Sequence, residues 1–527
     1  MLPTKNLPNA LITCLVKRLI LHNIKIFCIA PGIRNAPLIQ ELEECSSAVC
    51  HYFNDERSAG FFALGKSRSC NAPVCIVTTS GTASGELLAA FMEAYYTHTP
   101  LLAITCDRPK RFKDSNAPQT AEQVHLYGHY TPFFRDIESI ENFELSEWSQ
   151  HQPAHLNLRL EDPMNPTILE KKRPQSKNSL HFSEFIKTSK FPFIIVSEIP
   201  FEWKERIIRL LITLNAPTYL ESTSLIRENP MLESFRIKCI DGIMERAKSN
   251  GYPIDGVLRI GGIPTTRFWR DLENLSDIYV CSISHRNYSG LSWGKCAESW
   301  EQVEHEIPRF FRFDPSSFLE WKNHDAQLHF KMTKIFKDEL HSEPSLIHSL
   351  SSLLPHGSHI FLGNSQPIRY WDLAASYDFK NFQITASRGL NGIDGQLSTF
   401  FGLCESNSHN IAILGDLTLM HDMGAFWIHP QISCPFHIFV INNGGGGIFR
   451  HRYPLKSLQN SHSWDFSSLA TMWQIPYARY RGNIPKFSEL PPKALIELIP
   501  DLQATDKLWK TYQQLCLNIP CMLSTVS

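Results

Sequence analysis

Asp416 and Asn443 are the residues of this sequence whose types and spacing most directly suggest chemistry. Asp416 ends the apolar stretch "NIAILGD" (410–416), and Asn443 ends the next one, "FHIFVINN" (436–443), directly before four glycines. Their separation of 27 residues (443 − 416) is enough for one strand–helix–strand crossover. Ligands of open parallel sheets bind beyond the carboxyl ends of the strands, so both side chains are predicted to face one pocket.

The ligand that this set of residues favours is a divalent cation with a diphosphate. A carboxylate, an amide oxygen and a carbonyl exposed beside a glycine are hard oxygen ligands that suit Mg²⁺, which keeps further positions for phosphate oxygens. Glycine N–H groups can also approach a diphosphate closely. From these residues alone, an ordinary turn followed by a loose glycine loop is the alternative.

Parallel sheets are needed to position these residues, and the sequence contains strand-like apolar stretches separated by helical ones. The stretches lie at 24–30, 72–80, 99–106, 191–198, 257–262, 277–284, 358–365, 382–389, 410–416, 436–443 and 521–527, with helical patterns at 84–97 and 318–342. The alternation predicts an α/β protein in which each domain is a parallel sheet flanked by helices. We expect a first domain over 1–168, a polar linker over 169–190, a central domain over 191–325 and a third domain over 326–527.

Composition argues against several classes of protein. A net charge of −1 over 527 residues provides no global field for binding nucleic acid. The 14 cysteines form no C-x-x-C pair, which favours reduced thiols and a cytoplasmic location. The apolar N-terminal stretch is interrupted by Lys17 and Arg18 and is too short to span a bilayer. We therefore expect a helix packed on a sheet there, and no membrane insertion.

The pair Gly415–Asp416, followed at this distance by two asparagines, resembles the metal–diphosphate motif of thiamine-diphosphate (ThDP) enzymes. Leu417 in "GDLTLMHDM" is similar to one branch, the 2-succinyl-5-enolpyruvyl-6-hydroxy-3-cyclohexene-1-carboxylate synthases of menaquinone biosynthesis. Further segments resemble that family in the same order. They are "APGIRNAPL" (30–38), "FNDERSAGFFALG" (53–65), "TTSGTASGELLAA" (78–90), "TCDRP" (105–109), "GNSQPIR" (363–369), "SRGLNGIDGQLST" (387–399) and "NNGGGGIF" (442–449).

The resemblance implies the three-domain ThDP-binding fold, with a pyrimidine-binding first domain and a diphosphate-binding third domain. It implies a metal ion, Mg²⁺ or alternatively Mn²⁺, held by Asp416, Asn443 and the Gly445 carbonyl. Glu56 would bind the aminopyrimidine ring and Ile393 would wedge the cofactor into its bent form. From the residues alone, Asp55 and Glu56 would simply open a helix, and Ile393 would be a core residue. The cofactor-binding residues so implied are Pro31, Gly32, Ser365, Gly415, Asp416, Leu417, Thr418, Asn443, Gly445, Gly446, Ile448 and Phe449.

The same resemblance implies the substrates. The family decarboxylates 2-oxoglutarate and adds the succinyl carbanion equivalent to isochorismate in a 1,4-addition. Guanidinium groups match carboxylates bidentately, although a surface ion pair is the ordinary explanation of any one arginine. The expected substrate-binding residues are Arg34, Arg108, Gln119, Arg267, Arg369 and Arg388, of which Arg388 is also a catalytic candidate with Glu56 and Ile393. This sequence departs from the family pattern at Ile33, Pro118 and Phe268, where serine, asparagine and a basic residue are expected.

Two other enzyme classes are weighed against this assignment. Another ThDP enzyme, such as a 2-oxo acid decarboxylase or an acetohydroxyacid-synthase-like carboligase, would share the cofactor residues but not the arginines. A dinucleotide-binding oxidoreductase would need G-x-G-x-x-G after a strand, and "INNGGGG" lacks that spacing. The resemblance finally implies a homodimer or homotetramer with active sites at the subunit interface, where Glu56 acts on a cofactor anchored by the partner chain.

Overall fold

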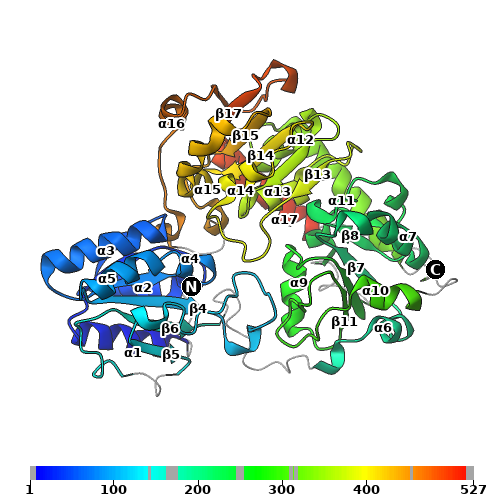
Figure 1. Cartoon of the computed structure of the whole chain (residues 1–527). Coiled ribbons are helices and arrows are strands. Elements are labelled where there is room, and N and C mark those ends of the chain that lie inside the picture. Colours follow the sequence, from blue (N-terminus) through cyan, green and yellow to red (C-terminus); the bar gives the residue numbers. More distant parts are fainter. Residues whose placement is uncertain are drawn as a thin grey trace. The chain divides into compact units, whose positions relative to one another are not determined.

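The computed structural model describes residues 8–139, 144–161, 176–244, 254–307, 313, 318–450 and 455–517. They form three parallel sheets flanked by helices, as predicted (Figure 1). The predicted strand at 521–527 and residues 169–175 of the predicted linker lie outside the described residues. No helix within the described part of the chain combines the length and the apolar character that crossing a membrane requires.

The first sheet has the strand order β2-β1-β3-β4-β6-β5, and all neighbours are parallel. Along β3, Cys75 and Val77 face the cluster that includes α1 and α2, whereas Val74 and Ile76 face the cluster of α3 and α5. A strand covered on both faces reads as a continuous apolar run, which explains why "APVCIVTTS" was recognisable. The strands are β1 (Ile26–Ile29), β2 (Val49–Tyr52), β3 (Val74–Thr78), β4 (Leu101–Asp107), β5 (Phe133–Ile137) and β6 (Ala154–Arg159). The helices are α1 (Pro8–Leu21), α2 (Ala36–Glu44), α3 (Glu56–Cys70), α4 (Thr82–Gly85) and α5 (Leu88–Tyr96).

The second sheet has the order β11-β10-β7-β8-β9. Helices α6 and α7 cover one face, and Trp269 of α9 and Trp321 of α11 pack on the other. In the predicted linker, residues 176–190 contain α6, and Ser179 pairs with Val280 of β11. The strands are β7 (Pro192–Val196), β8 (Thr218–Leu220), β9 (Arg236–Ile237), β10 (Gly256–Ile260) and β11 (Tyr279–Ile283). The helices are α6 (Phe182–Thr188), α7 (Lys204–Leu214), α9 (Arg267–Asp271), α10 (Trp300–Val303) and α11 (Leu319–Asp338).

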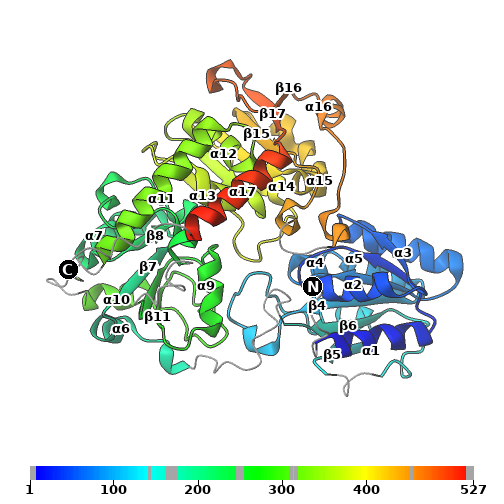
Figure 2. The ribbon, with the colours of Figure 1, turned by 180° about the vertical axis from the view of Figure 1, so that it is seen from behind.

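The third sheet has the order β13-β12-β14-β15-β17-β16. Helices α12 and α13 cover one face, and α14 and α15 cover the other. Figure 2 shows α17 alongside α11 and α12, which it contacts. The strands are β12 (His359–Leu362), β13 (Gln383–Thr385), β14 (Asn410–Gly415), β15 (Phe436–Ile441), β16 (Tyr477–Tyr480) and β17 (Lys493–Leu498). The helices are α12 (Glu343–Leu353), α13 (Gln366–Ala374), α14 (Gln396–Gly402), α15 (Asp416–His421), α16 (Ser467–Met472) and α17 (Leu502–Leu517).

The three sheets are distributed over two compact units of the chain. The first unit comprises Met1–Lys171 together with the short segments Gly389–Asp394 and Gly444–Ser463. The second unit comprises Lys172–Arg388, Gly395–Asn443 and Trp464–Ser527, and so contains both the second and the third sheet. The domain boundaries proposed from the sequence stay a prediction.

Buried charged groups join the second sheet to the third within the second unit. The buried guanidinium of Arg227 donates to the carbonyls of Ala375 (3.1 Å) and Ser376 (3.2 Å), at the carboxyl end of α13. A cation is favourable at that end of a helix. Asp372 of α13 accepts from the backbone N–H of Ser222 at 2.7 Å.

Glu221 follows β8 and is buried beside Asp372. Its Oε1 accepts from the N–H groups of Thr265 (2.6 Å) and Thr266 (3.0 Å), at the start of α9. Burial, and then the neighbouring charge of Asp372, raise the pKa of Glu221 to about 7, and burial also raises the pKa of Asp372.

This raised pKa predicts a pH-dependent stability. The folded state keeps a proton on Glu221 that the unfolded state loses near its ordinary value of 4.5, so stability falls as pH rises from there through 7. Each unit of the shift corresponds to about 1.4 kcal/mol. Glu221→Gln, which stays neutral, should therefore lose less stability than the wild type between about pH 5 and about pH 8, measured by thermal denaturation.

Glu202→Gln, at an exposed carboxylate of the same unit, is the control and should keep the pH profile of the wild type. Parallel pH profiles for Glu221→Gln and the wild type would contradict the assignment of the titration to Glu221.

Candidate functional site

The register of β14 and β15 brings Asp416 and Asn443 to one edge of the third sheet. Gly415 pairs with Ile441, so the residues that follow both strands leave the sheet at the same level. Asp416 is only 3% exposed, begins α15, and accepts from the N–H of Leu417 at 2.7 Å. The connection is α15 followed by a 3₁₀ stretch, Met423–Gln431, instead of the one helix expected between the strands. Pro430 lies inside that stretch and lacks the N–H that an α-helix would use.

In the side-chain amide of Asn443, the nitrogen has hydrogen-bond partners and the oxygen has none among the described residues. Its Nδ2 donates to both carboxylate oxygens of Glu343, at 3.2 Å from each. Its Oδ1 is buried and accepts no hydrogen bond from any residue that the structure describes. An unsatisfied buried acceptor costs about 1–3 kcal/mol, so a group that bound this oxygen would recover that cost. This orphaned oxygen fits a metal ligand.

The donor set at this edge differs from the metal sites built on acidic, histidine and cysteine side chains. Over the described ranges, no group of three or more such side chains could hold a metal ion. The expected ligands are the carboxylate of Asp416, the amide of Asn443 and the carbonyl of Gly445, of which the last belongs to the first unit. That set suits a hard cation that takes its remaining ligands from phosphate and water.

The glycine run lies in the first unit, against residues 459–462. Gly445 has φ of +141°, and a Cβ on it would lie 2.5 Å from the Gln459 carbonyl oxygen, so no larger residue fits there. Hydrogen bonds join Gly446 N to Gln459 O (2.5 Å) and His462 N to Gly444 O (3.0 Å). The glycine run is therefore an ordered loop that these hydrogen bonds hold in place. Phe449 packs partly against the core of the first sheet, with Ile448 beside it in a 3₁₀ turn.

Two further expected cofactor residues of the first unit, Pro31 and Gly32, follow β1, and Gly32 lies against Thr79, which follows β3. Gly32 approaches Thr79 so closely that a Cβ would lie 2.5 Å from the Thr79 Cβ. The buried Asn35 holds the Pro31–Gly32 turn, because it accepts from Gly32 N (2.8 Å) and donates to Ala30 O (2.9 Å). Sequence reasoning did not select Asn35, although it lies within the matching segment "APGIRNAPL".

Glu56 and Ile393 lie in the first unit as well. Glu56 is the partly buried first residue of α3, and Asp55 caps that helix by accepting from Ser58 N at 3.0 Å. Asp394, the neighbour of Ile393, accepts from Thr82 Oγ1 at 2.5 Å, at the start of α4. The helix-opening alternative thus describes Asp55 well, and the role of Glu56 stays a prediction.

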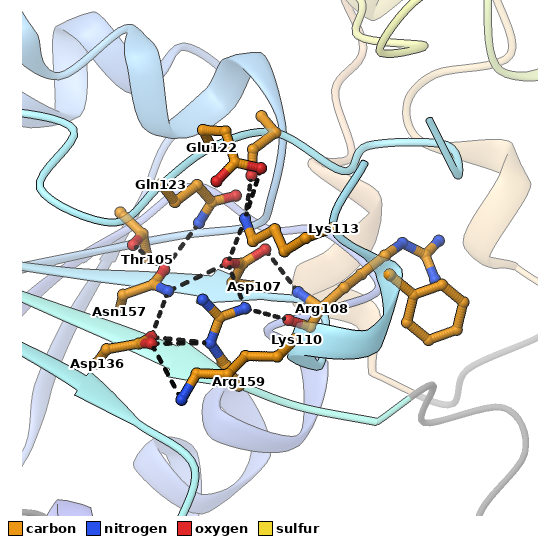
Figure 3. A network of polar contacts seen from close by, with 12 residues as sticks. Thr105, Asp107, Arg108, Lys110, Lys113, Glu122, Gln123, Asp136, Asn157 and Arg159 are labelled. Carbon is orange, nitrogen blue, oxygen red and sulfur yellow. Dashed lines mark hydrogen bonds and ion pairs between the residues drawn. The ribbon is translucent and has the colours of Figure 1, made fainter. Parts of the chain in front are cut away.

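A polar network fixes the segment that carries Arg108 (Figure 3). The guanidinium of Arg159 lies between two carboxylates, at 3.1 Å from Asp107 Oδ2 and 2.9 Å from Asp136 Oδ1. Arg159 also donates to the Arg108 carbonyl at 2.9 Å, and Lys113 Nζ lies 3.2 Å from Asp107 Oδ2. Asp107 and Arg159 are buried. Sequence reasoning missed this network because its members come from three different strands and a loop.

The substrate-binding candidates of the first unit are gathered around this network. Arg108 is buried, and its Nε donates to Pro118 O at 3.0 Å. Gln119 follows with φ of +58° and lies against Gly81. Arg34 is buried and donates to Leu160 O at 3.0 Å, directly after β6.

In the second unit, Arg388 and Arg369 lie near the loop after β12. Arg388 Nη1 donates to Asn364 Oδ1 at 2.8 Å, and its buried Nε has no hydrogen-bond partner among the residues described. Burial lowers the pKa of Arg388, and the charges of Glu221 and Asp372 act against that shift. Arg369 donates to the carbonyl of Ser365, whose φ is +69°.

Arg267 and Phe268 have different surroundings. Arg267 Nε forms an ion pair with Asp271 Oδ1 at 2.9 Å on α9, and its side chain is 38% exposed. This is the surface ion pair that we gave as the ordinary explanation of an arginine. Phe268 is buried in the core cluster beside Phe193 and Trp269.

Comparison with known proteins shows to which class of enzyme this chain belongs. Residues 10–126 match the family described as "Thiamine pyrophosphate enzyme, N-terminal TPP binding domain", where thiamine pyrophosphate is another name for ThDP. With three parallel sheets flanked by helices, this match makes the chain a ThDP-dependent enzyme.

The chain belongs to the 2-succinyl-5-enolpyruvyl-6-hydroxy-3-cyclohexene-1-carboxylate synthase family. The relative of that name from Bdellovibrio bacteriovorus is 34% identical, over 95% of this chain and 98% of its own length. Relatives of the same name from Akkermansia muciniphila (33%, over 95% and 98%) and Bacillus velezensis (29%, over 80% and 80%) are also similar. The resemblance inferred from the ordered motifs is confirmed.

The network of Figure 3 leads to a prediction about stability. Asp107→Asn removes the carboxylate shared by Arg159 and Lys113 and should lower the free energy of unfolding by about 3 kcal/mol, because a buried cation loses a partner. The measurement is urea denaturation followed by circular dichroism.

Glu93→Gln makes the same chemical change in the same unit, at an ion pair with Arg68 whose side chains are 47% and 50% exposed. It should cost less than about 1 kcal/mol. Equal costs for the two variants would contradict the role of Asp107 as a buried hub.

Proposed function

We propose that this enzyme decarboxylates 2-oxoglutarate and adds the resulting four-carbon unit to isochorismate, which gives 2-succinyl-5-enolpyruvyl-6-hydroxy-3-cyclohexene-1-carboxylate for menaquinone biosynthesis. The observation that carries the proposal is the buried Nε of Arg388, which has no hydrogen-bond partner among the described residues, together with the buried Arg34 and Arg108 of the first unit. Both substrates are dicarboxylates, and guanidinium groups match carboxylates bidentately. An assignment to the cytoplasm accompanies this proposal.

The cofactor would be held from both sides by the residues described above. Asp416, Asn443 and the Gly445 carbonyl would hold Mg²⁺, with Mn²⁺ as the alternative ion, against the diphosphate. When bound, ThDP supplies the electron sink for the carbon that loses CO₂. Glu56 would hold and move a proton at its carboxylate, as a general acid–base group must. Ile393 would act by packing against the rings.

Substrate carboxylates would be bound by Arg34, Arg108 and Gln119 of the first unit and by Arg369 and Arg388 of the second. The open Nε of Arg388 supports this role most directly, because a buried donor without a partner suits an anionic ligand. Arg267 is the weakest member of the set, since Asp271 already neutralises it. A carboligase for small neutral acceptors would not need so many cations.

The substrate assignment predicts that turnover depends on isochorismate. The purified protein with ThDP, Mg²⁺ and 2-oxoglutarate should release CO₂ much faster when isochorismate is added, with matching loss of isochorismate. Absence of that dependence would contradict the pathway assignment. Rapid consumption of pyruvate in its place would favour the rival carboligase.

A homodimer, or a pair of such dimers, is the proposed assembly. In support, α3 and α5 contact each other and expose apolar side chains, namely Phe61, Phe62, Leu88, Met92 and Tyr96. Trp427 in the stretch after α15 is 74% exposed. Large exposed apolar side chains are typical of protein interfaces. Each active site would combine Glu56 of one chain with Asp416 and Asn443 of the other.

Shared sites predict complementation between two inactive variants. Glu56→Gln should bind ThDP but hardly turn over, and Asp416→Ala should fail to bind ThDP. Co-expressed with different tags, the two should recover about a quarter of wild-type activity, because random pairing gives half heterodimers with one intact site of two. Activity no higher than that of either parent, or a monomer in sedimentation experiments, would contradict the shared site.

A further inference from the structure

We propose that Glu343 is a positioning residue that decides which end of the Asn443 amide faces the metal ion. The proposal rests on the metal site put forward above. Glu343 is 3% exposed and is the first residue of α12, one hundred positions before Asn443 in the sequence. It is absent from the motifs that the sequence analysis singled out.

The side-chain amide of an asparagine can adopt two orientations that differ by a half turn. The oxygen and nitrogen ends of an asparagine have nearly the same shape, so the hydrogen-bond partners decide the orientation. An ionised carboxylate only accepts hydrogen bonds. Both Glu343 oxygens lie 3.2 Å from Asn443 Nδ2, so the donor end is directed to Glu343 and Oδ1 is directed away from it.

The opposite orientation would be costly at this position. It would place Oδ1 against the Glu343 carboxylate, so that two acceptors faced each other in a buried site, and would turn the NH₂ group toward the cation. The observed orientation leaves Oδ1 as the buried atom without a partner. The ligand oxygen is thus aimed before a metal ion arrives, and binding pays no cost for reorienting it.

The fold holds Glu343 itself in place. Its backbone N–H donates to Thr505 Oγ1 of α17 at 3.1 Å. Ser342 caps the helix by accepting from Ser345 N at 3.3 Å, and Pro344 occupies the first turn. A carboxylate in the first turn of a helix is favoured by the helix dipole.

The test measures metal binding separately from activity. ThDP binding by the full-length protein is followed by tryptophan fluorescence while Mg²⁺ is titrated. Glu343→Gln, whose amide can donate as well as accept, allows Asn443 to flip. It should weaken the apparent Mg²⁺ affinity by about 10-fold to 100-fold, with turnover recovering at saturating Mg²⁺.

Glu339→Gln is the matched control. Glu339 accepts from the N–H groups of His341 (2.6 Å) and Ser342 (3.1 Å) just before the same helix, and among the described residues it has no hydrogen bond to Asn443. It should leave the Mg²⁺ affinity unchanged. An equal loss in both variants would assign the effect to a loosened helix and overturn the proposal, as would wild-type affinity in Glu343→Gln.

In the variant Asn443→Asp, the substitution Glu343→Gln should change the Mg²⁺ affinity in the opposite direction. In Asn443→Asp no amide can flip, and Glu343 then faces another carboxylate. Adding Glu343→Gln to Asn443→Asp should therefore strengthen Mg²⁺ binding, and a further weakening would overturn the proposal. Asp416→Ala distinguishes failure of the metal site from failure of the positioning role. If Asp416→Ala leaves the Mg²⁺ dependence of ThDP binding unchanged, the proposed metal site is wrong. If Asp416→Ala abolishes that dependence and Glu343→Gln does not change it, only the positioning role of Glu343 is rejected.

Discussion

The parallel register of the strands is the constraint on which the rest of this protein depends. Because neighbouring strands run in one direction, the residues that follow them leave the sheet at the same edge. Gly415 opposite Ile441 brings Asp416 and Asn443 to such an edge in the third sheet. In the first sheet, the same rule brings the segments after β1, β3 and β4 together, which are those of Gly32, Thr79 and Arg108.

Loops at a sheet edge need further anchors, and here these anchors are buried polar groups. Asp107 and Arg159 hold the segment of Arg108, Asn35 holds the turn at Gly32, and Glu221 holds the start of α9. Each of these groups would be costly alone, since an unpaired buried charge is far less stable than a paired one. Pairing therefore fixes a loop in one conformation, which a binding site requires.

The sequence predicted the strands that are mostly apolar, such as β3, β4 and β15, together with the cofactor edge. It missed β6, whose six residues are all buried although His155, Asn157 and Arg159 are among them. A buried strand with such residues is recognisable only when their partners are known, here Thr105 and Asp107 of β4, which contact His155 and Arg159. Strands β8 and β9 were also missed, since three and two residues carry no clear periodicity. Among the candidate site residues, Arg267 proved to be engaged in a surface ion pair.

The sequence alone was enough to determine the enzyme class and the family, because the ordered motifs around Asp416, Asn443 and the glycine run are local patterns of residue type and spacing. Only the tertiary structure decided how those residues are oriented. The direction of the Asn443 amide depends on Glu343, one hundred residues away, and the position of Arg108 depends on Arg159, 51 residues away. Such contacts form between elements that only folding brings together, so no local pattern could reveal them.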